Sequence, residues 1–179
     1  MMPSLLRKVA LTLHVVCSVG WFGAVAAFLA LALVGLTILD DPVVRAAYVA
    51  MDLITGLIIV PLSVAATVTG LVQSLSTPWG LFRHYWILAK LVITIPSTFI
   101  LLTHTRAINY MSIVAAEFPI APSDLRELRV QLAVTAGAAL VALLVTTALS
   151  VFKPRGLTPY GWRKLREGRI VVPDLDRVA

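Results

Sequence analysis

The stretch VALTLHVVCSVGWFGAVAAFLALALVGLTIL, residues 9–39, contains no Asp, Glu, Lys or Arg and decides the fold class. A helix needs about 20 apolar residues to cross the ~30 Å hydrocarbon core of a bilayer, and this run exceeds that length. Three further apolar runs follow, at residues 46–75, 85–105 and 130–152. The sequence therefore predicts an all-α integral membrane protein with four membrane-spanning helices.

The composition of the whole chain agrees with this class. Of its 179 residues, 59% are hydrophobic and 13% are charged, and the mean hydropathy is +0.93. Soluble domains are about 45–50% apolar and about 25% charged, so this chain lacks the charge that a soluble surface requires. The composition excludes a soluble enzyme, a disordered chain and a disulfide scaffold. A single cysteine, Cys17, also excludes an internal disulfide.

The connections between the runs predict how the helices are arranged. Residues 40–42 and 76–80 form tight turns, and such short links place consecutive helices side by side in an up-down four-helix bundle. The third connection, residues 106–129, is longer, and its residues 109–117 fit a short interfacial helix. Residues 1–152 are therefore expected to form the bundle, and residues 153–179 a basic tail.

Lysine and arginine residues flank the runs unevenly. Ten lie on the side of the two termini: Arg7, Lys8, Arg83, Lys153, Arg155, Arg163, Lys164, Arg166, Arg169 and Arg177. Four lie on the other side: Arg45, Arg106, Arg126 and Arg129. Cytoplasmic loops carry the excess of such residues, so we expect both termini in the cytoplasm. The net charge of +6 then reflects contact with anionic headgroups, above all through the tail, and not nucleic-acid binding.

A few polar side chains lie inside the predicted spans, where ionisable groups are costly and often functional. On the third span they share one helical face, which carries Arg83, Trp86, Lys90, Thr94, Ser97 and His104. On the second span, Asp52 lies near the outer side. A structural ion pair with Arg45 or Arg106 and a functional role are both compatible with its position.

These residues predict a cofactor site. His14 and Trp21 share a face of the first span, and Lys90 lies at a similar depth on the third, so we expect an inner-leaflet cavity between them. Imidazole is a common axial ligand of haem iron, and helix bundles hold such cofactors between facing helices. The expected site for haem b or a porphyrin comprises His14, Trp21, Arg83, His84, Trp86 and Lys90, with His14 and His84 as candidate iron ligands.

Three short motifs carry a family resemblance. Residues 13–16 read LHVV and are followed by GWFG at 20–23, residues 79–86 read WGLFRHYW, and residues 153–158 read KPRGLT. Together they resemble a bacterial family of predicted integral membrane proteins of unknown function. This resemblance covers almost the entire chain; it implies a location in a bacterial inner membrane and no assigned activity.

A more distant resemblance involves His14, Trp21, the stretch from Trp86 to Leu91 with its W-x-x-x-K-L pattern, and His104. These positions resemble the four-helix membrane protoporphyrinogen oxidase of the J type. The resemblance implies a b-type haem or porphyrin site that uses His14 and Lys90. Electron or proton transfer involving a membrane quinone or a porphyrin would follow from such a site. The first helix is also similar to the copper-resistance D domain, but the small number of methionines disfavours copper.

Two other functions remain open beside the haem or porphyrin site. The chain fits a non-catalytic membrane subunit, assembly factor or lipid-binding bundle, in which the Gly, Ser and Thr positions of the second span are packing surfaces that also suit a homodimer. A small transporter or proton pathway along the third-span face is the other alternative. The sequence does not decide whether the protein is an enzyme.

Overall fold

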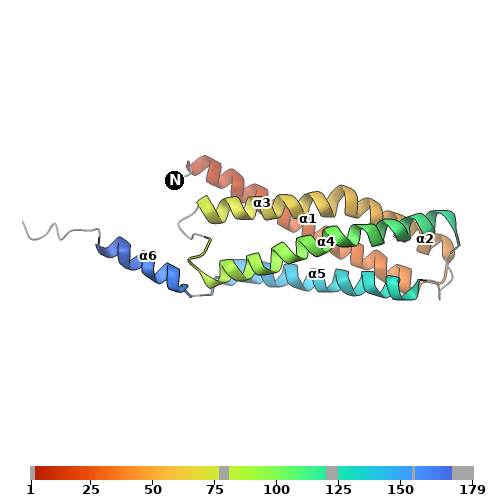
Figure 1. Cartoon of the computed structure of the whole chain (residues 1–179). Coiled ribbons are helices and arrows are strands. Elements are labelled where there is room, and N and C mark those ends of the chain that lie inside the picture. Colours follow the sequence, from red (N-terminus) through yellow and green to blue (C-terminus); the bar gives the residue numbers. More distant parts are fainter. Residues whose placement is uncertain (1–2, 77–80, 120–124, 155, 171–179) are drawn as a thin grey trace, which may run out of the picture.

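The computed structural model describes residues 3–76, 81–119, 125–154 and 156–170 (Figure 1). The helices in chain order are α1 (Ser4–Thr37), α2 (Asp41–Ile54), the π-helical turn η1 (Thr55–Ile59), α3 (Val60–Ser76), α4 (Tyr85–Glu117), α5 (Arg126–Phe152) and α6 (Pro159–Ile170). Within these described ranges there is no strand, and the isolated bridge that they contain pairs His84 with Leu157. Most of the expected turn at 76–80, together with Arg155 and Arg177, lies outside the described residues.

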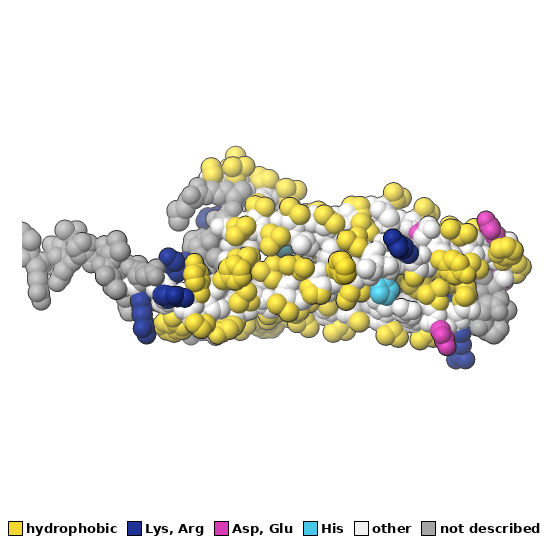
Figure 2. Space-filling view, viewed as in Figure 1, with side chains coloured by type: hydrophobic (Ala, Val, Ile, Leu, Met, Phe, Trp, Pro, Cys, Tyr) yellow, Lys and Arg dark blue, Asp and Glu magenta, His cyan; other side chains and the backbone are white. Residues whose placement is uncertain are grey.

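Four stretches are long and apolar enough to cross a membrane, namely α1, the run from Asp41 to Leu75, α4 and α5. The prediction of an all-helical chain with four such helices is confirmed. With 34 residues, α1 is about 51 Å long at 1.5 Å per residue. Large apolar side chains face outward, among them Val92 at 70% exposure and Phe99 at 68%. Figure 2 shows one face of the bundle covered by such side chains, which is compatible with a multi-pass membrane protein surrounded by lipid.

The fourth helix is longer than expected, because residues 109–117 continue it instead of forming a separate interfacial helix. Its last turns carry a buried face of Ile108, Met111, Ser112 and Ala115. This spacing of three and four residues packs the helix against α2. Packing against the bundle therefore keeps this segment aligned with the span that precedes it.

The second span contains a π-helical turn, for which Pro61 supplies a physical reason. Proline has no amide hydrogen, and in a regular helix its ring collides with the carbonyl four residues earlier. In the wider turn, the amide of Val60 donates to the carbonyl of Thr55. Thr55 itself is buried, and its hydroxyl donates to the Met51 carbonyl at 2.7 Å. The chain thus continues from α2 into α3 without leaving the bundle.

The two ends of the bundle differ in packing, and we name them after the helices found there. The α2 end contains Thr37, Asp41, Glu117 and Arg126; the α6 end contains Ser4, Tyr85 and Phe152. The core gathers toward the α2 end, where the buried residues include Phe28, Ala32, Val44, Ala47, Tyr48, Met51, Ile108, Met111, Ala115, Arg129, Leu132, Ala133 and Ala136. Before Trp21, none of the described residues of α1 is buried.

Helix α6 was not predicted as a separate element, yet its start carries a helix signal. Thr158 is its N-cap, since the Gly161 amide donates to Thr158 Oγ1 at 3.1 Å, and Pro159 follows at the first helical position. Thr158 also fixes the helix to the bundle: its hydroxyl donates to the Phe82 carbonyl and its amide to the Arg83 carbonyl, the latter at 3.0 Å. From there α6 projects beyond the end of the bundle (Figure 1).

Candidate functional site

His14 lies in the interface between α1 and α3. Its Nδ1 is 3.1 Å from the Ala66 carbonyl oxygen and 3.1 Å from Thr69 Oγ1. The Thr69 hydroxyl donates to the Ala65 carbonyl at 2.6 Å, so its oxygen is available to accept from the imidazole. Because a carbonyl oxygen only accepts, these contacts require the proton on Nδ1 and leave the lone pair on Nε2. Among the described residues, Nε2 has no hydrogen-bond partner.

A glycine makes room for this imidazole. A β-carbon at Gly70 would lie 3.0 Å from His14 Cε1, which is closer than an ordinary van der Waals contact. Gly70, one of the small residues of the second span, therefore provides the space that the His14 ring occupies.

Trp21 belongs to the packed core at 4% exposure. Its indole Nε1 is buried and has no acceptor within the described part of the chain. A buried donor that is left unsatisfied costs roughly 1–3 kcal/mol. The indole would therefore benefit from an acceptor on a bound molecule or on a water.

Lys90 lies between α4 and α5. Its ammonium donates to Ser150 Oγ at 3.1 Å and sits over the Trp86 ring, 4.6 Å from the ring centroid. A lysine ammonium has three donors, and no carboxylate among the described residues pairs with it. The site thus presents a half-buried cation with a neutral hydroxyl and an aromatic face as its partners.

The structure places His14 and Lys90 on different interfaces of the bundle. His14 is held by α3, whereas Lys90 is held by α5 and by Trp86 of its own helix. Neither a hydrogen bond nor a ring contact joins these two described residues. A ligand that uses both would therefore have to reach across the bundle interior.

Arg83 and His84 precede α4 and meet the segment that leads into α6. The backbone of His84 pairs with Leu157, and the Tyr85 amide donates to the Gly156 carbonyl at 3.4 Å. The His84 ring lies 6.2 Å from the Trp86 ring, measured between centroids, at an interplanar angle of 55°. This junction therefore brings His84 next to one member of the predicted site, Trp86.

Asp52 and His104 have local partners at the α2 end. Asp52 accepts a hydrogen bond from Asn109 at 3.4 Å, and neither Arg45 nor Arg106 forms an ion pair with it. His104 Nδ1 donates to the Ile100 carbonyl at 2.9 Å, one turn earlier in the same helix. Neither residue contacts His14 or Lys90 among the bonds that the described residues form.

Two hydroxyl groups of α4 bond mainly to their own helix: that of Ser97, which belongs to the predicted polar face, and that of the adjacent Thr98. Ser97 donates to the Ile93 carbonyl at 2.7 Å, and Thr98 donates to the carbonyl of Thr94 at 3.0 Å. One contact reaches another helix, since Thr98 Oγ1 lies 3.3 Å from Thr67 Oγ1 of α3. Such back-bonding is common for Ser and Thr in helices, and it satisfies these groups without a ligand.

Two arginines that the sequence placed among the flanking charges, Arg129 and Arg45, form structural contacts between helices. Arg129 is 3% exposed, and its Nε donates to Tyr48 Oη at 3.0 Å while its Nη2 donates to the Gly35 carbonyl. It joins α5 to α2 and α1. Leu132, Ala133 and Ala136 follow Arg129 by three, four and seven residues and are also buried. This helical spacing is the sequence signal that Arg129 faces inward.

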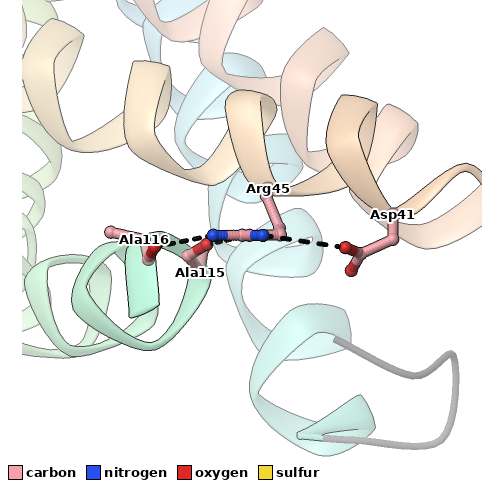
Figure 3. Close-up of polar contacts among 4 residues, drawn as sticks. All are labelled: Asp41, Arg45, Ala115 and Ala116. Carbon is pink, nitrogen blue, oxygen red and sulfur yellow. Dashed lines mark hydrogen bonds and ion pairs between the residues drawn. The ribbon is translucent and has the colours of Figure 1, made fainter. Parts of the chain in front are cut away.

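The other arginine, Arg45, closes the end of α4 (Figure 3). Its Nε donates to the Ala115 carbonyl and its Nη2 to the Ala116 carbonyl, the latter at 2.6 Å. Nη1 is 3.9 Å from Asp41 Oδ2, four residues earlier in α2. The last carbonyls of a helix lack partners within it and carry partial negative charge, so Arg45 stabilises the end of α4 against α2.

The described residues contain no group of three or more His, Cys, Asp or Glu side chains placed to hold a metal ion. Comparison of the chain with protein-family models, with curated proteins and with solved structures finds no match.

Proposed function

We propose that this multi-pass membrane protein binds haem b or a porphyrin between its helices and takes part in electron transfer. The observation that carries the proposal is the hydrogen bonding of His14. With Nδ1 donating to the Ala66 carbonyl, the imidazole is held in the tautomer whose Nε2 can ligate iron. A backbone carbonyl that accepts from the other ring nitrogen commonly orients a histidine that binds a metal ion.

The other residues of the predicted site have matching roles. Lys90 offers an ammonium that has no carboxylate partner among the described residues, which suits a propionate group, and Arg83 lies at the same end of the bundle. Trp21 and Trp86 would line the bound macrocycle, and His84, beside Trp86, is the candidate second iron ligand. A bound haem would supply one-electron chemistry; the chain would hold its iron and its carboxylates and exclude water.

Absorption spectra test this proposal directly. Protein purified from haem-replete cells is expected to show a Soret band, and apoprotein is expected to take up added haem. His14→Ala should abolish the band, whereas His104→Ala is the matched control, because His104 bonds only within the described residues of the α2 end. Absence of a Soret band and of haem uptake in the wild-type protein would refute the proposal.

A non-catalytic membrane module is the second candidate, and the back-bonded hydroxyls favour it. Ser63, Thr67, Ser97 and Thr98 each donate to a carbonyl of their own helix, so the polar faces are satisfied as packing surfaces. For a subunit or assembly factor, His14→Ala and Lys90→Ala would change stability or complex formation, and no variant would change a redox signal.

The proposed location is a bacterial inner membrane with both termini in the cytoplasm. Its support is the excess of Lys and Arg on the terminal side of the spans, ten residues against four. A C-terminal fusion to a reporter that is active only in the cytoplasm should be active. Activity of a periplasm-specific reporter at the same position would reverse the orientation.

A further inference from the structure

Basic residues are concentrated at the α6 end of the bundle, where the acidic residue of α6 is Glu167. Acidic side chains occur at the α2 end: Asp40, Asp41, Asp52, Glu117 and Glu127. In Figure 2 the acidic side chains in view also lie toward the end opposite α6. The α6 end carries cations on several elements: Arg7, Lys8, Arg83, Lys153, Arg163, Lys164 and Arg166.

One helical face of α6 gathers two of these cations around an aromatic ring. Pro159, Trp162, Arg163 and Arg166 follow one another at steps of three, one and three residues, and they line a surface groove of about 740 Å³. We call these four residues the α6 face. Arg163 and Arg166 have no hydrogen-bond or ion-pair partner among the described residues, and Trp162 is 54% exposed.

Contacts between the start of α6 and the bundle fix the position of the α6 face. Gly161 is buried against the Arg83 carbonyl and the Leu157 side chain, and any side chain at this position would collide with that carbonyl. Helix α6 begins seven residues after Phe152, the exposed last residue of α5. The α6 face therefore starts beside the surface at which a membrane-spanning helix ends.

We propose that the α6 face binds the phosphate group of an anionic phospholipid in the leaflet at the α6 end. The planar fork of arginine matches phosphate oxygens, and tryptophan is enriched where protein crosses the membrane–water interface. Each basic residue near an anionic surface contributes about fivefold to the affinity, so the two arginines together contribute about 25-fold. This lipid site is independent of the proposed haem site, since it uses neither His14 nor Lys90.

Tryptic cleavage after Lys164 of the full-length protein in nanodiscs tests this proposal. For the wild-type protein, cleavage should be several-fold slower in phosphatidylcholine with phosphatidylglycerol than in phosphatidylcholine alone. Arg163→Gln with Arg166→Gln should remove this dependence on lipid, and Arg163→Lys with Arg166→Lys should preserve most of it. Because each variant is compared with itself in two bilayers, changes in the intrinsic cleavage rate cancel.

A matched control uses two exposed arginines of the α2 end, Arg106 and Arg126. Replacing both by Gln should leave the lipid dependence as in the wild-type protein. Equal cleavage of the wild-type protein in both bilayers would overturn the proposal, as would protection of the Gln variant. Protection by inorganic phosphate without phosphatidylglycerol would assign a free-anion site instead, and protection only by an acidic peptide would assign a protein partner.

Discussion

The two ends of the bundle differ in how they accommodate a basic side chain within an apolar fold. At the α2 end, Arg129 is enclosed by the core and bonded to Tyr48 and to the Gly35 carbonyl. At the α6 end, Lys90 is only half-buried, and its described partners are the Ser150 hydroxyl and the Trp86 ring. We call the first arrangement a structural joint, because its guanidinium bonds to groups of the protein. In the second arrangement, the Lys90 ammonium keeps N–H donors for a molecule from outside the chain. Stability and binding are therefore expected to reside at opposite ends.

The largest loss of stability is expected from Arg129→Ala. This change leaves the buried Tyr48 hydroxyl and the Gly35 carbonyl without their charged donor, at a cost of roughly 2–4 kcal/mol in the free energy of unfolding. Unfolding in detergent micelles, followed by circular dichroism, measures it. Arg126→Ala, one turn earlier and exposed, should change little. Equal effects of the two substitutions would contradict the role of Arg129 as a buried contact between helices at the α2 end.

Gly35→Ala should cost somewhat less, through overpacking at the same joint. A β-carbon at this position would lie 2.6 Å from Tyr48 Cζ, and forcing an additional carbon into a packed core costs roughly 1–3 kcal/mol. Gly23→Ala in the same helix is the control, because a β-carbon there meets nothing within 4 Å. The same unfolding assay should show Gly23→Ala as neutral or slightly stabilising; a destabilisation matching that of Gly35→Ala would contradict the assigned packing.

Ser150→Ala should have the smallest effect, because it removes one hydrogen bond from the loosely packed end. Hydrogen bonds between helices in membranes average about 0.6 kcal/mol, so the unfolding midpoint should shift only slightly. Ser150→Thr keeps the hydroxyl and serves as the control. A loss as large as that of Arg129→Ala would show that Lys90 belongs to a structural joint as well.

Much of the fold could be predicted from the sequence, because a bilayer imposes length and polarity on any chain that crosses it. Four apolar runs were sufficient to predict the four long helices. The continuation of α4 to Glu117 was not predicted, since residues 109–117 are too polar for a span and are held by packing against α2. Helix α6 was missed although Thr158 and Pro159 form a typical helix start.

The candidate site was predicted as a set of residues but not as a set of contacts. Helical phase predicts which side chains share a face of one helix, yet it carries no information about the rotation of one helix against another, and Arg83, which was included in the predicted face, precedes α4. The separate partners of His14 and Lys90 depend on that rotation. Arg129 was assigned to the membrane boundary from its place before an apolar run, and only its phase with Leu132 distinguishes it from exposed Arg126.

The π-helical turn has a consequence for the orientation of α3. Across it, the buried positions Met51, Thr55, Ile59 and Ser63 are spaced four residues apart. In a regular helix of 3.6 residues per turn, three such steps rotate the buried face by about 120°. A wider turn holds more residues per revolution and so reduces this drift. The same face can then point inward in both α2 and α3.

The number of residues in this turn therefore determines which groups of α3 face His14. Removing one residue from it, such as the exposed Leu57, would rotate α3 by about 100° relative to α2. Ala66 and Thr69, the hydrogen-bond partners of His14, would turn away from α1. The span should therefore tolerate many apolar substitutions on its lipid face but no deletion within the turn, since a deletion there would break the His14 contacts without changing any residue that makes them.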